Sequence, residues 1–286
     1  LQPERSKAHQ AFIDCLLDAL QHAPEAMPAL QPLLSRWVED EQAAEHVRVA
    51  AYRAWRRHVV PEKRVQQIQV WLDAFEGQRE QICDLVDACL EDAYPQQIQT
   101  DVLRFLPREH RSITVWWFWS HKFMQLTPPE LLPSLVKAWR LKFPQGLIAP
   151  VGHTCEEVQA ALLRAVLEHH GDTASGQDLF EWLAVGLDEY GFAIQNEDNK
   201  FLLAWLQARP EAVKSVAALC WQSVQADEHG RKFYPLALQR LRGVQLPSDW
   251  VRWQMDLALS SEDADLVRYL LLDVKGSVLH AVKNLD

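Results

Sequence analysis

Apolar residues recur from Leu1 to Asp286 with the spacing of short amphipathic helices. Leu, Ala, Gln, Glu and Arg dominate, and no long stretch alternates apolar with polar residues as a half-buried strand would. Roughly fourteen helices of ordinary length are expected, many of them opened by a proline or a capping residue. Because each helix buries only one stripe, neighbouring helices have to stack on one another.

Local motifs predict several helix ends. Thr127-Pro128-Pro129-Glu130 has the residues of a capping box, with a Thr to cap, proline in the first turn and a Glu three residues on. Asn196 and Pro210 each precede or open an apolar-periodic run. Gly171 follows His169 and His170, where a left-handed residue would close a helix.

The last third of the chain predicts helix pairs. The expected pairs are 178–190 with 197–208, 211–225 with 232–242, and 249–259 with 262–272. Short connections favour antiparallel packing, so the predicted fold is all-α, an irregular HEAT-like α-solenoid of antiparallel helix pairs.

Glycine usage suggests an internal division. Only Gly77 occurs before residue 146, and nine of the ten glycines lie at or beyond it. We therefore expect an N-terminal helical array over 1–145 and a C-terminal helical repeat array over 146–286. One continuous solenoid with a longer loop at 143–152 is the alternative.

The bulk composition excludes several classes of protein. With 48% hydrophobic residues the chain can bury an extended core, and no segment approaches the ~20 apolar residues that a membrane span requires. Five scattered cysteines form no disulfide framework, which indicates reduced thiols and a cytoplasmic location. The first residues contain neither an initiator Met nor a signal-peptide run, so a fragment of a longer chain is expected.

The most unusual local stretch is aromatic. Trp116, Trp117, Phe118 and Trp119 are consecutive, and four neighbours cannot share one helical face because each is turned by about 100° from the last. The segment is either buried on several sides or forms part of an interface, for which Trp is well suited. We expect burial to dominate and keep all four residues as candidates for partner binding.

A local basic segment is the second candidate. Arg53, Arg56 and Arg57 fall on one side of a predicted helix. They could contact nucleic acid, or they could form a solvated face paired with Glu41, Glu45 or a neighbouring acidic helix. The net charge of −10 argues against general affinity for phosphate backbones.

No motif for catalysis, metal binding or nucleotide binding is present in the sequence. It contains no H-E-x-x-H, Walker or G-x-G-x-x-G pattern and no G-x-S-x-G elbow. We therefore expect no cofactor, no metal and no enzymatic activity. A helical enzyme whose site residues converge only in three dimensions remains the alternative.

Two segments resemble a known family. Residues 119–133, from Trp119 to Pro133, and residues 246–259, from Leu246 to Leu259, are similar to helical repeats that follow the NTPase in large bacterial NACHT-type proteins of the STAND class. The resemblance covers about half the chain and includes no ATP-binding residue. It implies a C-terminal sensor or autoinhibitory solenoid in an intracellular defence protein.

Both lines of reasoning predict a non-catalytic helical-repeat scaffold for protein interaction, ligand sensing or autoinhibition. Its expected partner is another protein or the remainder of the parent chain. Nucleic acid is not the expected partner, and no membrane association is expected. A HEAT-like nucleic-acid-binding domain is the alternative binding function.

Overall fold

Helices make up most of the part of the chain that the structure describes. The computed structural model describes residues 7–79, 81–106, 117–143, 153–183 and 196–226, together with residues 252, 256, 259 and 260. These residues include no strand, which confirms the all-helical prediction.

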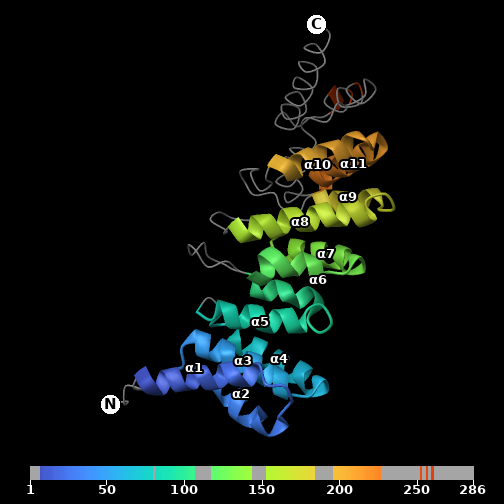
Figure 1. The fold of residues 1–286 in the computed structure, drawn as a ribbon. Helices are drawn as coiled ribbons and strands as arrows, with labels where there is room; N and C mark the ends of the chain where they lie inside the picture. Colours follow the sequence, from blue (N-terminus) through green and yellow to red (C-terminus); the bar gives the residue numbers. More distant parts are fainter. Residues whose placement is uncertain are drawn as a thin grey trace. The chain divides into compact units, whose positions relative to one another are not determined.

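The helices belong to two compact units, residues 1–128 and 129–286 (Figure 1). The described part of the first unit contains the 3-10 helices η1 and η2, the π-helix η3 and six α-helices: α1 (Lys7–Gln21), η1 (Pro28–Leu30), α2 (Gln31–Glu39), α3 (Glu45–His58), α4 (Pro61–Phe75), α5 (Cys83–Ala93), η2 (Gln99–Phe105), η3 (Phe118–Lys122) and α6 (Phe123–Leu126). Among its described residues, the second unit contains a 3-10 helix and five α-helices: η4 (Pro129–Leu131), α7 (Leu132–Lys142), α8 (His153–His170), α9 (Gly176–Leu183), α10 (Asn196–Gln207) and α11 (Pro210–Ala226).

Three of the predicted helices are confirmed as α9, α10 and α11, each beginning within two residues of its expected start. The helices predicted at 232–242, 249–259 and 262–272 lie almost wholly outside the described residues. The domain boundary predicted at 145/146 also lies outside them and stays a prediction.

The first unit is centred on α3. Helices α1 and α2 both pack on α3, and α3 and α4 pack on α5. The ring centroids of Trp55 and Trp71 lie 4.5 Å apart in an edge-to-face contact, with Tyr52 beside them. Burying three large aromatic side chains supplies much of the apolar area that holds α3 and α4 together.

A buried histidine fastens α1 to α3. His58 accepts a hydrogen bond from the Met27 amide on Nδ1, at 2.8 Å, so its Nε2–H donates to the Leu20 carbonyl, at 3.0 Å. Both ring nitrogens are thereby satisfied at a fully buried position.

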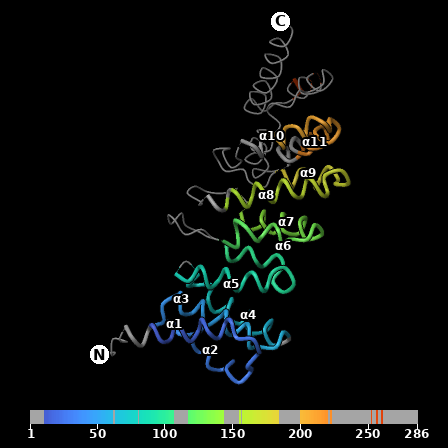
Figure 2. The backbone as a smooth tube through the Cα atoms, viewed as in Figure 1, coloured from blue at the N-terminus to red at the C-terminus, as the bar shows by residue number. Residues whose placement is uncertain are grey.

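Helices of the second unit stack on their second neighbours along the chain. Helix α9 packs on α7 and α11, and α10 packs on α8, as the tube in Figure 2 allows the reader to follow. Helix α9 packs mainly on α11 rather than on α10, its predicted partner. Consecutive helices are in contact as well, α7 with α8, α8 with α9, and α10 with α11.

Two of the predicted helix ends form for other reasons. Thr127 ends α6 as its C-cap instead of opening the next helix, and its hydroxyl donates to the Phe123 carbonyl and bonds the Tyr94 hydroxyl. Gly171 does end α8, but its φ lies outside the left-handed region. Glycine is needed there because a Cβ would collide with the Trp205 ring and the Leu167 carbonyl.

A capping box that the sequence analysis did not identify opens α9. The Ser175 hydroxyl accepts the Asp178 amide at 3.1 Å, and the Asp178 carboxylate accepts the Ser175 amide at 3.1 Å.

Candidate functional site

The aromatic segment is mostly part of the core. Phe118 and Trp119 are buried, and their rings pack against Tyr94 and Phe123 of the same unit. Trp116 lies outside the described residues. These two aromatics therefore cannot bind a partner without leaving the core, in line with the expected predominance of burial.

Trp117 differs from its neighbours because half of its surface is exposed. Its ring stacks on His121, with centroids 4.1 Å apart and planes 16° from parallel. The intervening residues belong to the π-helix η3, whose wider turn brings these side chains into register. Of the described aromatic candidates, Trp117 alone presents a large surface to solvent.

A buried carboxylate holds the start of η3. Asp87 of α5 accepts the Phe118 amide on Oδ2 at 3.0 Å, while its Oδ1 has no partner. Burial raises the pKa of Asp87 to about 7, and the Phe118 amide lowers it by less. Burial therefore makes the ionised form of Asp87 unfavourable in the folded protein, although this carboxylate holds the Phe118 amide.

The basic segment is largely occupied by structural contacts. Arg56 pairs with Asp92 of α5 at 3.2 Å, and Tyr52 also donates to that carboxylate. Arg57 donates to the carbonyls of Ala23 and Pro24, at 3.1 and 2.9 Å. Arg53 is exposed and makes no such contact within the described part of the chain. The three arginines do not act as one free cationic face.

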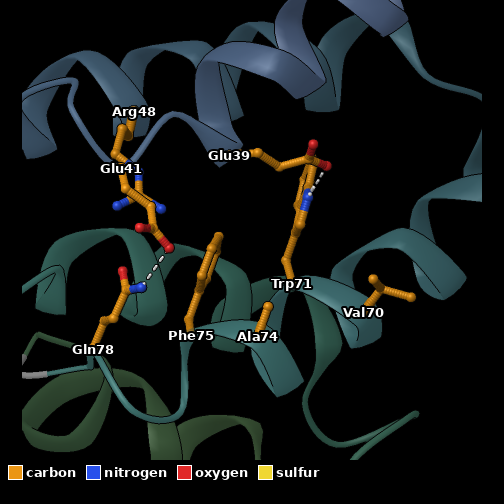
Figure 3. A pocket seen from close by; sticks show the side chains of 8 residues that line it. All are labelled: Glu39, Glu41, Arg48, Val70, Trp71, Ala74, Phe75 and Gln78. Carbon is orange, nitrogen blue, oxygen red and sulfur yellow. Dashed lines mark hydrogen bonds between the residues drawn. The ribbon is translucent and has the colours of Figure 1, made fainter.

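A small cleft lies between α4 and the end of α2 with the turn that follows it (Figure 3). It encloses about 160 Å³, below the ~300–1,000 Å³ of pockets that hold drug-sized ligands. Its lining side chains, which define the Arg48 cleft, are Glu39, Glu41, Arg48, Val70, Trp71, Ala74, Phe75 and Gln78.

Arg48 is the unusual member of this lining. Only 2% of its surface is exposed, its Nε donates to the Val38 carbonyl at 2.8 Å, and its Nη2 has no hydrogen-bond partner. The guanidinium lies 5.1 Å from the centroid of the Phe75 ring. Burial lowers the pKa of Arg48, and the nearby Glu41 and Asp40 oppose that effect.

Two carboxylates also line the cleft, Glu41 beside Arg48 and Glu39 beside Trp71 (Figure 3). Glu39 accepts the Trp71 indole N–H at 2.8 Å, and Glu41 accepts the Gln78 amide at 2.7 Å (Figure 3). Both glutamates are exposed and retain free acceptor capacity. The cleft thus combines a buried donor, two acceptors and an aromatic floor.

Glu45, Cys83 and Asp84 bring their side-chain ligand atoms within 4.8 Å of one another. The Glu45 carboxylate accepts the Asp84 amide at 2.7 Å, which satisfies an N–H at the start of α5. Burial raises the pKa of Cys83 to about 12, so its sulfur is a neutral thiol rather than a thiolate ligand. This grouping is explained as a helix cap supplied by a neighbouring helix.

Helix α1 exposes an apolar stripe that the sequence analysis did not single out. Phe12 is 65% exposed, Leu16 is 41% exposed, and Cys15 and Ala19 are also exposed. We call these four residues the α1 stripe. Their spacing of i, i+3, i+4 and i+7 places them on one face, next to the face that buries Ile13 and Leu17.

The acidic residues of α1 lie apart from the α1 stripe. At about 100° per residue, Asp14 and Asp18 are turned about 160° from Phe12 and Leu16, so they lie on another side of the helix. Their side chains are 45% and 69% exposed, with His46 and His22 nearby. The sequence signal for the α1 stripe was the width of the apolar arc on α1, which exceeds what one packing face requires.

The chain matches no protein-family model, no curated protein and no solved structure. Within the described residues, every helix is too short or too polar to cross a bilayer. Function therefore has to be argued from the surfaces themselves.

Proposed function

We propose that this protein is a non-catalytic helical-repeat scaffold that binds an amphipathic helix of another protein on the α1 stripe. The exposed second apolar face of α1 is the observation that carries the proposal. In a stack of helices, each contact buries one apolar stripe of a helix. Helix α1 has two such faces, so it can pack on the chain with one and on a partner helix with the other.

The packing order within each unit supports the repeat reading. An irregular α-solenoid whose equivalent helices stack would produce contacts between second neighbours, and such contacts join α1 to α3, α3 to α5, α7 to α9, and α9 to α11. We propose this arrangement for the whole chain. The likeness to the repeats of NACHT-type proteins remains a prediction of the sequence.

The chemistry of the stripe specifies the partner helix. Phe12 and Leu16 supply apolar contacts of the kind that anchor a helix in a groove, read at i, i+3, i+4 and i+7 on the partner. The partner is therefore a helix with an apolar stripe.

Nucleic-acid binding is less well supported. Arg56 and Arg57 are held by Asp92 and by backbone carbonyls, which leaves Arg53 to neutralise phosphates from that helix. One free arginine releases too few counterions for useful affinity at physiological salt.

Selection of helical peptides tests the proposal. A displayed library of 15-residue amphipathic peptides is selected on the full chain, and the enriched peptides are then measured on the wild type and on the Phe12→Asp variant. We expect enriched peptides with an apolar stripe that bind the wild type at micromolar concentration. Their affinity should fall at least about tenfold on Phe12→Asp, because an apolar anchor is replaced by a charge.

Leu141→Asp is the matched control, because Leu141 is 75% exposed on α7 but lies in the other unit. Its peptide affinity should equal that of the wild type. Enriched peptides that bind Phe12→Asp as tightly as the wild type would contradict the proposal, as would self-association that saturates the stripe.

A further inference from the structure

We propose that two copies of this chain associate through an exposed apolar surface formed by η1 and the start of α2. We call this surface the α2 face; its exposed residues are Met27, Pro28, Ala29, Pro32 and Leu33. The contact is separate from the α1 stripe, so it adds self-association to partner binding and does not depend on it.

The first argument is that α2 has no polar side where the α2 face lies. Helix α2 is at one edge of the first unit, where it packs on α3 and buries Leu34 (Figure 1). Its outer side exposes 51% of Met27 and 48% of Leu33, and no charged residue occurs between Glu25 and Arg36. A helix with one side in the core normally turns charged or polar residues to solvent on the other. An apolar outer side of this kind marks a surface that another molecule covers.

The second argument is that the α2 face is held rigidly. Arg57 of α3 donates to the carbonyls of Ala23 and Pro24, at 3.1 and 2.9 Å, and the Met27 amide donates to His58 Nδ1 at 2.8 Å. These three bonds fix the loop that enters η1 to the end of α3. The proline and alanine side chains of the face lose no rotamer freedom on burial. Covering this surface therefore costs little ordering.

The third argument is that the charges at the two ends of the α2 face complement each other. Glu25 precedes the face and Arg36 follows it; both are exposed, and neither pairs with another described residue. A two-fold axis perpendicular to α2 places the helix antiparallel to its own copy, so each Glu25 meets Arg36 of the second copy. The same register places Leu33 of each copy against Pro28 of the other. The occupant that these charges specify is thus a second copy of this chain.

Sedimentation equilibrium of the full chain measures the association. The α2 face covers about two helical turns, which is less than a standard interface, so we expect a weak dimer with a dissociation constant of about 10–100 µM. A chain that stays monomeric up to about 500 µM would overturn the proposal.

A charge placed in the α2 face should break the dimer. Leu33→Asp should raise the dissociation constant at least about tenfold, because each copy buries an unpaired carboxylate against an apolar surface. The position is exposed, so the monomer should remain folded. Val65→Asp is the matched control, because Val65 is an exposed aliphatic residue on α4 of the same unit, and its dimer should equal that of the wild type. A dimer that survives Leu33→Asp but is lost in Phe12→Asp would place self-association on the α1 stripe and refute this proposal.

Exchanging the two charges tests the antiparallel register. Glu25→Arg alone and Arg36→Glu alone should each weaken the dimer about three- to tenfold, because like charges then meet at both ends of the contact. The double variant restores opposite charges and should return the dissociation constant to within about twofold of the wild type. A double variant that dimerises as weakly as the single variants would refute the pairing of Glu25 with Arg36 and overturn the proposed contact.

Discussion

The aromatic segment and helix α1 carry the same kind of apolar side chain but use it in opposite ways. Phe118 and Trp119 lie in the core, although four consecutive aromatics are the most conspicuous feature of the sequence. Phe12 and Leu16 sit in an ordinary helix, yet remain exposed on a continuous face. Exposure follows from how many neighbours a helix has, and not from how apolar its residues are.

The largest expected effect is a difference in stability between two variants of the aromatic segment. Phe118→Ala should lower the free energy of unfolding by about 3–5 kcal/mol, because a fully buried ring is lost. Trp117→Ala should cost about 1 kcal/mol or less, since its ring is half exposed. Urea unfolding measures both losses, with the dependence of the unfolding free energy on urea concentration held equal for the variants and the wild type. Equal losses would place Trp117 in the core as well.

The same test on α1 compares two adjacent residues. Ile13→Ala should lower the free energy of unfolding by about 2–4 kcal/mol, while Phe12→Ala should change it by about 0.5 kcal/mol. Urea unfolding of the two variants measures both changes in the free energy of unfolding. A large loss for Phe12→Ala would mean that the α1 stripe is covered within the chain itself.

Ionisation of Asp87 should make the aromatic segment sensitive to pH. Its folded-state pKa is raised to about 7, so the folded chain binds the extra proton between about pH 4 and pH 7 and loses stability as pH rises through 7. Asp87→Asn keeps the acceptor for the Phe118 amide but carries no charge. We expect the stability advantage of Asp87→Asn over the wild type to shrink by about 2–3 kcal/mol from pH 8 to pH 5. A constant difference across that range would show that Asp87 does not titrate there.

The smallest effect concerns the basic segment. Arg56→Met should cost about 0.5–1 kcal/mol through the lost Asp92 pair, and less at high salt, whereas Arg53→Met should change stability within error. Thermal unfolding at two salt concentrations checks this. If the two variants changed stability equally and independently of salt, the pair between Arg56 and Asp92 would not stabilise the fold.

Sequence reasoning predicted the elements of this fold better than its surfaces. Periodicity and the residues Asn196 and Pro210 located α10 and α11, because those signals act within a few residues. The bond from Phe118 to Asp87 joins residues 31 positions apart and has no local signal. Gly171 shows the same limit, since the Trp205 ring that requires it comes from another helix.

The candidate sites also differ in whether local sequence or contacts between distant residues determine them. The contrast between Trp117 and Phe118 depends on the π-helix and the packing of α5, and the occupation of Arg56 depends on Asp92. The Arg48 cleft joins α2, α3 and α4, so no short motif encodes it. Only the α1 stripe could have been found, from an apolar arc too wide for one contact.

The most direct test of the partner-binding proposal uses Cys15, the exposed thiol within the α1 stripe. Its alkylation rate by a bulky maleimide is followed by peptide mass mapping, with and without a saturating selected helix. We predict that the bound helix slows alkylation of Cys15 at least about tenfold, and that prior alkylation prevents the helix from binding. An unchanged rate at Cys15 with the helix bound would place the binding surface elsewhere and contradict the account.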